Sequence, residues 1–237
     1  MMTSTQAAGL RRGLRRGSLS PELIVTESLR LLDEEGTDGF SLPKLGRALG
    51  ADPTAVYRHF ASKDDLVLAI ADQLIEEAMT GFSAQPCWAG TLADAVRRLH
   101  RTYLAHPAAA SLSASCTAHR PVRMRAVDIA IGAVLDAGFE GAEAALVYRA
   151  LSDFALAWAR SALEERAQRG DRAQHGGQHA WPRAYLAVEQ ADHPHIWRVR
   201  QELPGVGDNA IFETILSLVI GGLVGRAPRP CGCHGGQ

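Results

Sequence analysis

Residues 41–63, with the sequence SLPKLGRALGADPTAVYRHFASK, constrain the fold of this chain more than any other stretch. Leu42, Leu45 and Leu49 recur at steps of three and four, which predicts a short helix that buries them on one face. Ser41 can cap this helix, because its hydroxyl can accept from the free backbone N–H groups of the first turn.

A second short helix follows after a tight turn. Gly50 can end the first helix because a left-handed backbone costs glycine little. Asp52 and Pro53 then supply an acidic cap and a proline at a first helical position. Val56 and Phe60 point inward, which leaves a polar, aromatic and cationic outer face made of Thr54, Tyr57, Arg58 and His59. Two helices so joined, with such a face, predict a helix-turn-helix that enters the major groove of DNA.

The segment ALGADPTAVYRHFASKDDL, preceded by a helix and the run GFSL, resembles the DNA-binding head of TetR-family transcriptional regulators. The similarity is dense from about residue 24 to residue 74. The alternative is an ordinary three-helix cluster, but such a cluster has no need for an exposed Tyr-Arg-His face.

The resemblance implies an all-α fold, with an N-terminal three-helix helix-turn-helix head and a larger helical body for ligand binding and dimerisation. We expect a disordered basic arm over 1–19, the head over 20–66, the body over 67–226 and a disordered tail over 227–237. The segment GFEGAEAALVYRALSDFALAW resembles a helix start in the C-terminal domain of the tetracycline-repressor subgroup.

Whole-chain charge does not identify a nucleic-acid partner, because the formal net charge is −1. The distribution is more informative. Positive charge is concentrated in the N-terminal arm, at Arg11, Arg12, Arg15 and Arg16. This arm either reaches phosphates or a minor groove, or is a solvated tail.

Four cysteines are too few and too scattered for a disulfide framework in 237 residues, which favours a reducing cytoplasm. The Arg-rich start is followed by LIVTESLRLL, which carries charge too early to form the apolar core of a secretion signal. The apolar run 211–225 contains Glu213 and is shorter than the ~20 residues of a membrane span. We therefore expect a soluble cytoplasmic protein without a membrane partner.

In the head, Pro21 opens a helix capped by Ser20 and ended by Gly36, and Ser62 caps a fourth helix that runs to Gly81. The body is expected to be helical over 91–105, 108–116, 121–137, 143–169 and 209–225, with Asp208 as the last cap and a loop over 171–184. In the helix over 121–137, one face is expected to carry Met124, Val127, Ile131 and Leu135.

The candidate DNA-binding residues are Lys44, Pro53, Thr54, Ala55, Tyr57, Arg58, His59 and Lys63. The family resemblance places Tyr57, His59 and Lys63 at phosphate-contacting positions, with Lys44 as an addition, whereas Pro53, Thr54 and Ala55 open the recognition helix where side chains meet base edges. Pro43 stands where tetracycline repressors carry a base-reading arginine, and Arg58 replaces a tryptophan of that subgroup. The operator sequence therefore does not carry over.

The body is expected to hold a small-molecule effector in an apolar, aromatic pocket. The candidate ligand-binding residues are Tyr103, His106, Tyr148, Phe154 and Trp158. Aromatic residues at helical spacing also serve as core. His106 lies near a position where tetracycline repressors use a histidine on their metal-chelated drug, but Pro107 follows it, so no metal is inferred.

The helices over 143–169 and 209–225 are the expected homodimer interface. Otherwise an apolar patch, which soluble monomers avoid, would be exposed at Leu216, Val219, Ile220 and Leu223. The alternative is burial of these side chains inside one chain. A two-fold dimer requires a palindromic operator.

The sequence thus predicts a ligand-responsive transcriptional regulator, most simply a repressor that a small molecule releases from its operator, with an activator as the alternative. No motif for hydrolysis, phosphate binding or dinucleotide binding is present, so we expect no enzyme and no cofactor. A metal-responsive regulator of the same fold is a further alternative, because Cys231, Cys233 and His234 are potential zinc ligands.

Overall fold

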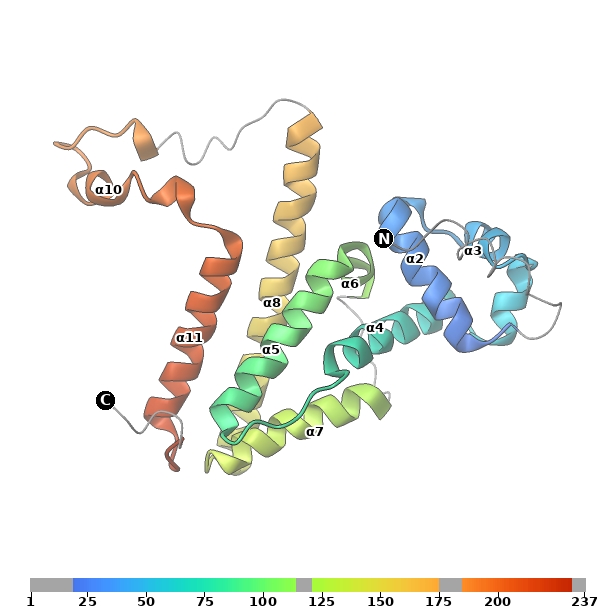
Figure 1. Ribbon diagram of the computed structural model, residues 1–237, viewed down its shortest axis with the longest axis horizontal. Coiled ribbons are helices and arrows are strands. Elements are labelled where there is room, and N and C mark those ends of the chain that lie inside the picture. The colour runs from blue at the N-terminus through green and yellow to red at the C-terminus, as the bar shows by residue number, and fades with distance from the viewer. Residues whose placement is uncertain (1–18, 114–120, 175–184, 232–237) are drawn as a thin grey trace, which may run out of the picture.

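The computed structural model describes residues 19–113, 121–174 and 185–231. Within these ranges every regular element is a helix and no strand occurs, which confirms the all-α fold. A small head lies at one end of the molecule and a larger helical body at the other (Figure 1).

The head begins with α2 (Pro21–Gly39). The backbone N–H of Leu23 donates to Ser20 Oγ at 3.2 Å, so Ser20 is the predicted cap. Gly36 has φ 72°, a left-handed value that interrupts the helix at the position where the sequence predicts its end.

The next two elements form the helix-turn-helix. Helix α3 (Leu42–Ala48) is capped by Ser41. Gly50, two residues after its end, has a left-handed backbone with φ 62°. The following element, η1 (Pro53–Arg58), is a six-residue 3-10 helix, tighter than the α-helix that the sequence suggests. Gly46 allows the close approach of the two, because a Cβ there would lie 3.0 Å from Ala51 O and from Pro53.

One apolar core joins the head to the body. It contains residues of α2, α3 and η1 together with Leu66, Ile70 and Leu74 of α4 (Lys63–Met79). Ala109 and Ala110 of α6 (Pro107–Ser113) are fully buried in the same core. Two body helices are therefore packed directly against the DNA-binding head.

The body is built around α5 (Trp88–Ala105), α7 (Pro121–Asp136) and α8 (Gly141–Gln174). Cys87 caps α5, which therefore starts three residues before the predicted Thr91. Helix α8 extends to Gln174, so the predicted loop over 171–184 is wrong at its first four residues, and residues 175–184 lie outside the described ranges.

The predicted inner face of helix α7 agrees with the structure only in part. Met124 and Leu135, both predicted to face inward, are 48% and 45% exposed. Val134 and Ala133 are buried instead. Val127, also predicted to face inward, lines a cavity in the body, so the prediction is confirmed there and is wrong at Met124 and Leu135.

The C-terminal part contains α10 (Pro194–Val199), the 3-10 turn η2 (Leu203–Gly205) and α11 (Asp208–Arg226). Asp208 lies in the first turn of α11 and is not its cap, which is Gly207. The 19 residues of α11 are long and apolar enough to cross a membrane by length and composition. Phe212, Leu216 and Ile220 are buried against the rest of the body, but only 17% of the most apolar window of α11 is buried in the single chain.

The residues after α11 turn back onto the body. Arg229 N–H donates to Ala137 O at 2.9 Å, and Cys231 is buried in the body core. The disordered tail predicted over 227–237 therefore has an ordered beginning over residues 227–231. Residues 232–237, like most of the predicted arm over 1–19, lie outside the described ranges.

Candidate DNA interface and ligand pocket

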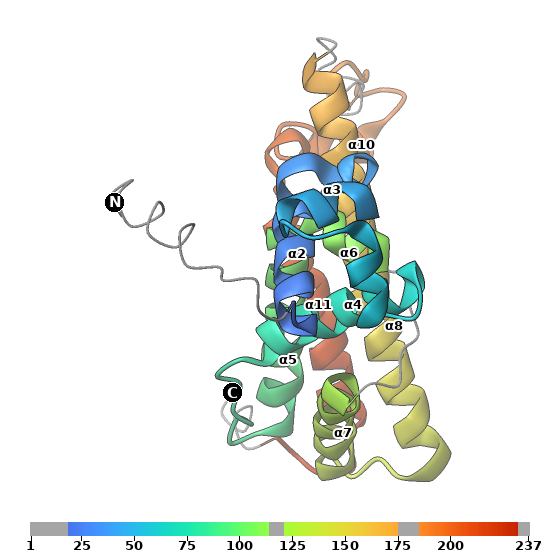
Figure 2. The ribbon, with the colours of Figure 1, turned by 90° about the vertical axis from the view of Figure 1, so that its right-hand side faces the viewer.

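The candidate DNA-binding residues belong to α3, η1 and the start of α4, in the head that faces the viewer in Figure 2. Val56 and Phe60 are 1% and 4% exposed, and they anchor η1 to the core. Between them Tyr57 is 53% exposed, and the side chains of four further candidates are also exposed, namely Thr54, Arg58, His59 and Lys63. All five side chains are thus accessible at the surface of the head, whereas Pro53 and Ala55 are half-buried.

Lys44 has a different environment from the other candidate cations. Its Nζ forms an ion pair with the Glu35 carboxylate of α2, and its side chain is partly buried. A phosphate contact by Lys44 would therefore have to compete with Glu35. The nearby Arg47, which is not one of the candidates predicted from the sequence, is exposed on the last turn of α3.

Asp52 fixes the start of η1. Its Oδ1 accepts from Thr54 N at 2.8 Å and from Thr54 Oγ1 at 2.6 Å, and these hydrogen bonds lower the pKa of Asp52 below its usual range. The Thr54 hydroxyl proton is thus directed to Asp52. What Thr54 presents outward is its methyl group and the remaining lone pairs of its oxygen.

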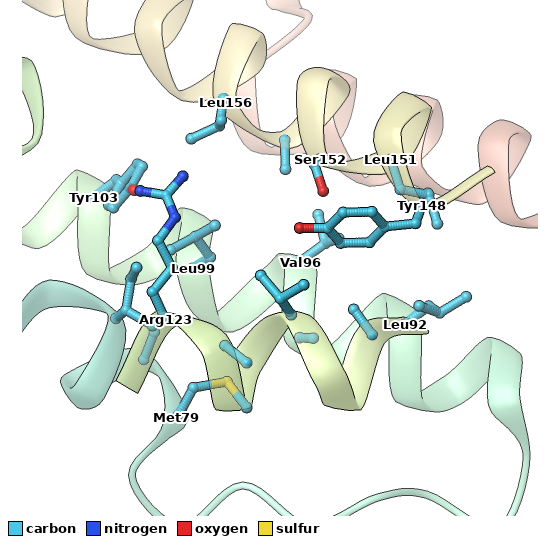
Figure 3. A pocket seen from close by; sticks show the side chains of 17 residues that line it. Met79, Leu92, Val96, Leu99, Tyr103, Arg123, Tyr148, Leu151, Ser152 and Leu156 are labelled. Atoms are coloured by element: carbon cyan, nitrogen blue, oxygen red, sulfur yellow. The ribbon is translucent and has the colours of Figure 1, made fainter. Parts of the chain in front are cut away.

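The body contains a cavity of about 150 Å³ between four helices (Figure 3). Ile75 and Met79 of α4 and Leu99 of α5 form part of its apolar wall, and the rest comes from α7 and α8. Four described lining residues carry polar side-chain groups, namely Tyr103, Arg123, Tyr148 and Ser152. An apolar cavity with a few convergent polar groups is the usual form of a small-molecule site.

Two of the five candidate ligand residues, Tyr103 and Tyr148, line this cavity. Phe154 and Trp158 do not, because they pack on the opposite side of α8, where the Trp158 ring lies 6.1 Å from that of Phe212 in α11. Sequence periodicity did not indicate Arg123, since it favoured Met124 as the inward residue at the start of α7.

His106 lies outside the cavity, at the junction of head and body. Its Nδ1 is 2.8 Å from Asp33 Oδ2 in α2, and its Nε2 is 3.2 Å from Glu77 Oε2 in α4. It also ends α5, only three residues after the cavity residue Tyr103. His106 therefore connects the pocket helix to the first helix of the head.

A second histidine, His100, is buried between α5 and α11. Its ring stacks on Phe212 at 3.8 Å between centroids, and burial lowers the pKa of His100. Its Nδ1 has no hydrogen-bond partner among the described residues. Beside it, Arg97 of α5 and Glu213 of α11 form an ion pair at 2.8 Å.

No group of three or more potential metal ligands occurs among the described residues. His193 and His195 are exposed at the start of α10. His175, His179, Cys233 and His234 fall outside the residues that the structure describes, whereas Cys231 is buried in the body core.

A helix-turn-helix head joined to an all-helical body with an apolar cavity defines a ligand-binding class of DNA-binding regulator. Both parts of the chain match models of known protein families. Residues 24–70 match the model of bacterial regulatory proteins of the tetR family, and residues 83–226 match the tetracycline repressor-like C-terminal domain. The chain belongs to the TetR family. It is a DNA-binding transcriptional regulator and not an enzyme.

Individual relatives agree with this assignment. The chain is 28% identical to the class A tetracycline repressor from transposon 1721 of Escherichia coli over 211 residues, which cover 88% of this chain and 92% of that one. A solved structure of a "possible TetR family transcriptional regulator" from Streptomyces coelicolor A3(2) is 28% identical, with a TM-score of 0.68 over 86% of this chain and 98% of the other. ActR from Streptomyces coelicolor, solved in complex with actinorhodin, has the same fold, with a TM-score of 0.74 and 22% identity over 90% and 99% of the two chains.

Proposed function

We propose that this chain is a transcriptional repressor that binds a palindromic operator as a homodimer and is released by a small molecule held in the body cavity. The observation that carries the proposal is the course of α4. Its first half is part of the head core through Leu66 and Ile70, and its last turns line the cavity through Ile75 and Met79. A ligand that displaces the cavity end of α4 would therefore move the head.

The DNA half of the proposal rests on the exposed surface of η1. Tyr57, His59 and Lys63 are available for phosphate groups, which fix the position of a protein on a duplex without reading sequence. Thr54 is available for a base edge. Two such heads on a two-fold axis require half-sites about one helical turn of DNA apart, or a multiple of it.

The ligand half rests on the cavity and on the head–body contacts. The relatives include a tetracycline repressor and ActR solved with actinorhodin, so related bodies accommodate small molecules. To turn operator binding off almost completely, the effector must favour the non-binding conformation by about 5 kcal/mol. The contacts of α6 with α2 and of His106 with Asp33 offer a second route for such a shift, beside α4.

The proposed dimer interface uses exposed apolar positions of α8 and α11. We propose other residues for it than those expected from the sequence, because Leu216 and Ile220 are buried within the chain and Val219 and Leu223 pack against the same core. Leu218 is 70% exposed, and a Cβ at Gly222 or Gly225 would meet nothing within 4 Å. On α8, Leu146 is 65% exposed. A symmetry-related copy would cover these positions.

The test is a footprint of the purified full chain on the DNA around its own gene. We expect protection of one palindrome, a dimer by sedimentation, and affinity that falls steeply with salt because phosphate contacts release counterions. An organic extract of a culture of the source organism should release the wild-type protein from the operator. It should not release the Ala155→Trp variant, because the larger side chain fills the cavity. A monomer without salt-sensitive binding to any fragment of this region would refute the proposal.

A further inference from the structure

Two hydroxyl groups in the wall of the cavity have no hydrogen-bond partner. Tyr148 and Ser152 both line the cavity, and they are four residues apart on α8, so they are neighbours on one face of this helix. Figure 3 shows both side chains pointing into the cavity, with their hydroxyls close to each other. Within the ranges that the structure describes, neither hydroxyl is hydrogen-bonded to the other or to any further residue. Both are therefore available to a bound molecule.

Ser152 differs in this respect from other serines inside helices of this protein. Ser28 Oγ donates to the carbonyl oxygen four residues earlier at 2.7 Å, and Ser113 Oγ makes the same contact at 2.8 Å. This return of the hydroxyl to the helix backbone is available to any helical serine. Ser152 does not make it, so its O–H remains directed to the cavity.

The surroundings of the two hydroxyls are aliphatic. Leu92 and Val96 of α5 and Leu151 of α8 lie near them in the wall (Figure 3). A hydroxyl that is removed from water without a new partner costs free energy, and aliphatic side chains supply no acceptor. A ligand that covers this part of the cavity therefore binds well only if it brings an acceptor for both O–H groups.

Two O–H donors that converge on one point match a carbonyl oxygen. Such an oxygen has two lone pairs and no proton, so it can accept from both hydroxyls at once. An alcohol brings a proton of its own. While both protein hydroxyls donate to the alcohol oxygen, this third proton finds no acceptor in the aliphatic wall. The two hydroxyls therefore favour a carbonyl over an alcohol of the same shape.

We propose that the effector is an apolar molecule with a carbonyl oxygen, such as a ketone, and that the hydroxyls of Tyr148 and Ser152 both donate to this oxygen. This inference rests on the proposed function, because it gives the chemical class of the ligand for the same cavity. An apolar cavity of about 150 Å³ accommodates a molecule about the size of benzene, so the buried part of the effector is of this order. The carbonyl then fixes its orientation.

The test uses two small probes that differ only in the oxygen group. Acetophenone carries a ketone, and 1-phenylethanol carries an alcohol on the same carbon skeleton. Each is titrated into the full chain, and the NMR signals of the methyl groups of Leu92, Val96 and Leu151 give its dissociation constant in the cavity. Acetophenone should bind about fivefold more tightly than 1-phenylethanol, which is the effect of one unpaired hydrogen-bonding group.

Tyr148→Phe and Ser152→Ala each remove one hydroxyl and keep most of the side-chain volume. Each should weaken the binding of acetophenone about fivefold, and the double variant should lose the preference for the ketone. Tyr103→Phe is the matched control, because it removes a hydroxyl from the same cavity at the end away from the pair (Figure 3). It should leave the preference unchanged. Circular dichroism melting shows whether each variant is folded, and either single variant tests the proposal if the other is unstable.

Equal affinity of the wild type for the two probes would overturn the proposal, as would an unchanged preference in the double variant. A larger loss with Tyr103→Phe than with Tyr148→Phe, or no methyl shift with either probe, would also overturn it. Operator binding and its release by the culture extract are measured separately, without these probes. Failure of the probe experiment therefore leaves the proposed function standing, whereas failure to bind an operator leaves the probe result unchanged.

Discussion

His106 Nδ1 lies 2.8 Å from Asp33 Oδ2, so the residue that ends the pocket helix α5 is hydrogen-bonded to the first helix of the head. Neither residue is fully exposed, with side-chain exposures of 20% and 33%. The contact joins two elements that are more than 70 residues apart in the sequence. It is a direct contact between the helix that carries the cavity residue Tyr103 and the first helix of the head.

Replacement of His106 tests the strength of this link. We expect His106→Ala to lower the free energy of unfolding by about 1 kcal/mol, because a partly buried hydrogen bond to a carboxylate is lost. Urea denaturation followed by circular dichroism measures the change. His195→Ala is the matched control, since His195 is exposed on α10. Equal effects of the two substitutions would contradict a structural role for the Asp33 contact.

Tyr57→Ala should weaken binding to operator and to unrelated duplex DNA by a similar factor, about tenfold, because a phosphate contact does not read sequence. Fluorescence anisotropy on both duplexes at one salt concentration measures this factor. Tyr57→Phe keeps the ring and removes the hydroxyl, so it shows which of the two groups contributes to DNA binding. If operator affinity were unchanged in Tyr57→Ala, the assignment of the η1 surface to DNA would be wrong.

Thr54→Val should change preference at one base position, by about 1–3 kcal/mol if Thr54 makes a good contact. Valine keeps the shape of threonine and the backbone N–H that Asp52 caps, so the start of η1 is retained. Binding to a set of operators with single base changes measures the effect. Lys63→Ala is the comparison, and it should weaken all of these operators about equally. A uniform loss with Thr54→Val would instead indicate a phosphate contact.

Leu218→Glu tests the dimer interface. Leu218 is 70% exposed in the single chain, so the substitution should leave the fold intact, but a dimer would bury one carboxylate from each copy. We expect the dimer dissociation constant to rise at least about a hundredfold, close to 3 kcal/mol. Sedimentation velocity measures it. Leu135→Glu on α7, where Leu135 is 45% exposed, should leave the dimer unchanged. A dimer that tolerates Leu218→Glu would exclude this part of α11 from the interface.

His100 should make stability depend on pH. Because burial lowers the pKa of His100 in the folded chain, the unfolded chain binds more protons below its ordinary value near 6.5. Stability therefore rises with pH in this window and is lost as pH falls from about 6.5 toward the lower folded value, by at most about 1.4 kcal/mol per pH unit. His100→Gln should flatten the dependence measured by urea denaturation from pH 7 to pH 5, whereas His195→Gln should not.

The sequence predicted the head in more detail than the body. Ser20, Ser41, Asp52 and Ser62 all accept the backbone hydrogen bonds expected of caps. Caps, glycine turns and short leucine repeats act over four or five residues, so they can be recognised locally. The 3-10 form of η1 was not predicted, and neither was the close approach of Pro53 to Gly46, which is a contact between two elements.

The pocket was predicted only in part. Of the candidate ligand residues, Tyr103 and Tyr148 line the cavity, but the sequence pattern placed Met124 inside and passed over Arg123. In α7 the apolar residues occur on several faces, so periodicity does not define which one is buried. The orientation depends on how closely the alanines of this helix approach α5 and α8, and that information is distributed over distant parts of the chain.

By itself, the sequence determined that this protein is helical and that Val56 and Phe60 leave Tyr57 outward, because such features follow from local hydrogen bonding and from the period of a helix. Only the tertiary structure decided that Arg123 faces a cavity, that His106 contacts Asp33, and that Leu216 is buried while Leu218 is exposed. These relationships depend on the packing of side chains from separate helices, which no local pattern encodes.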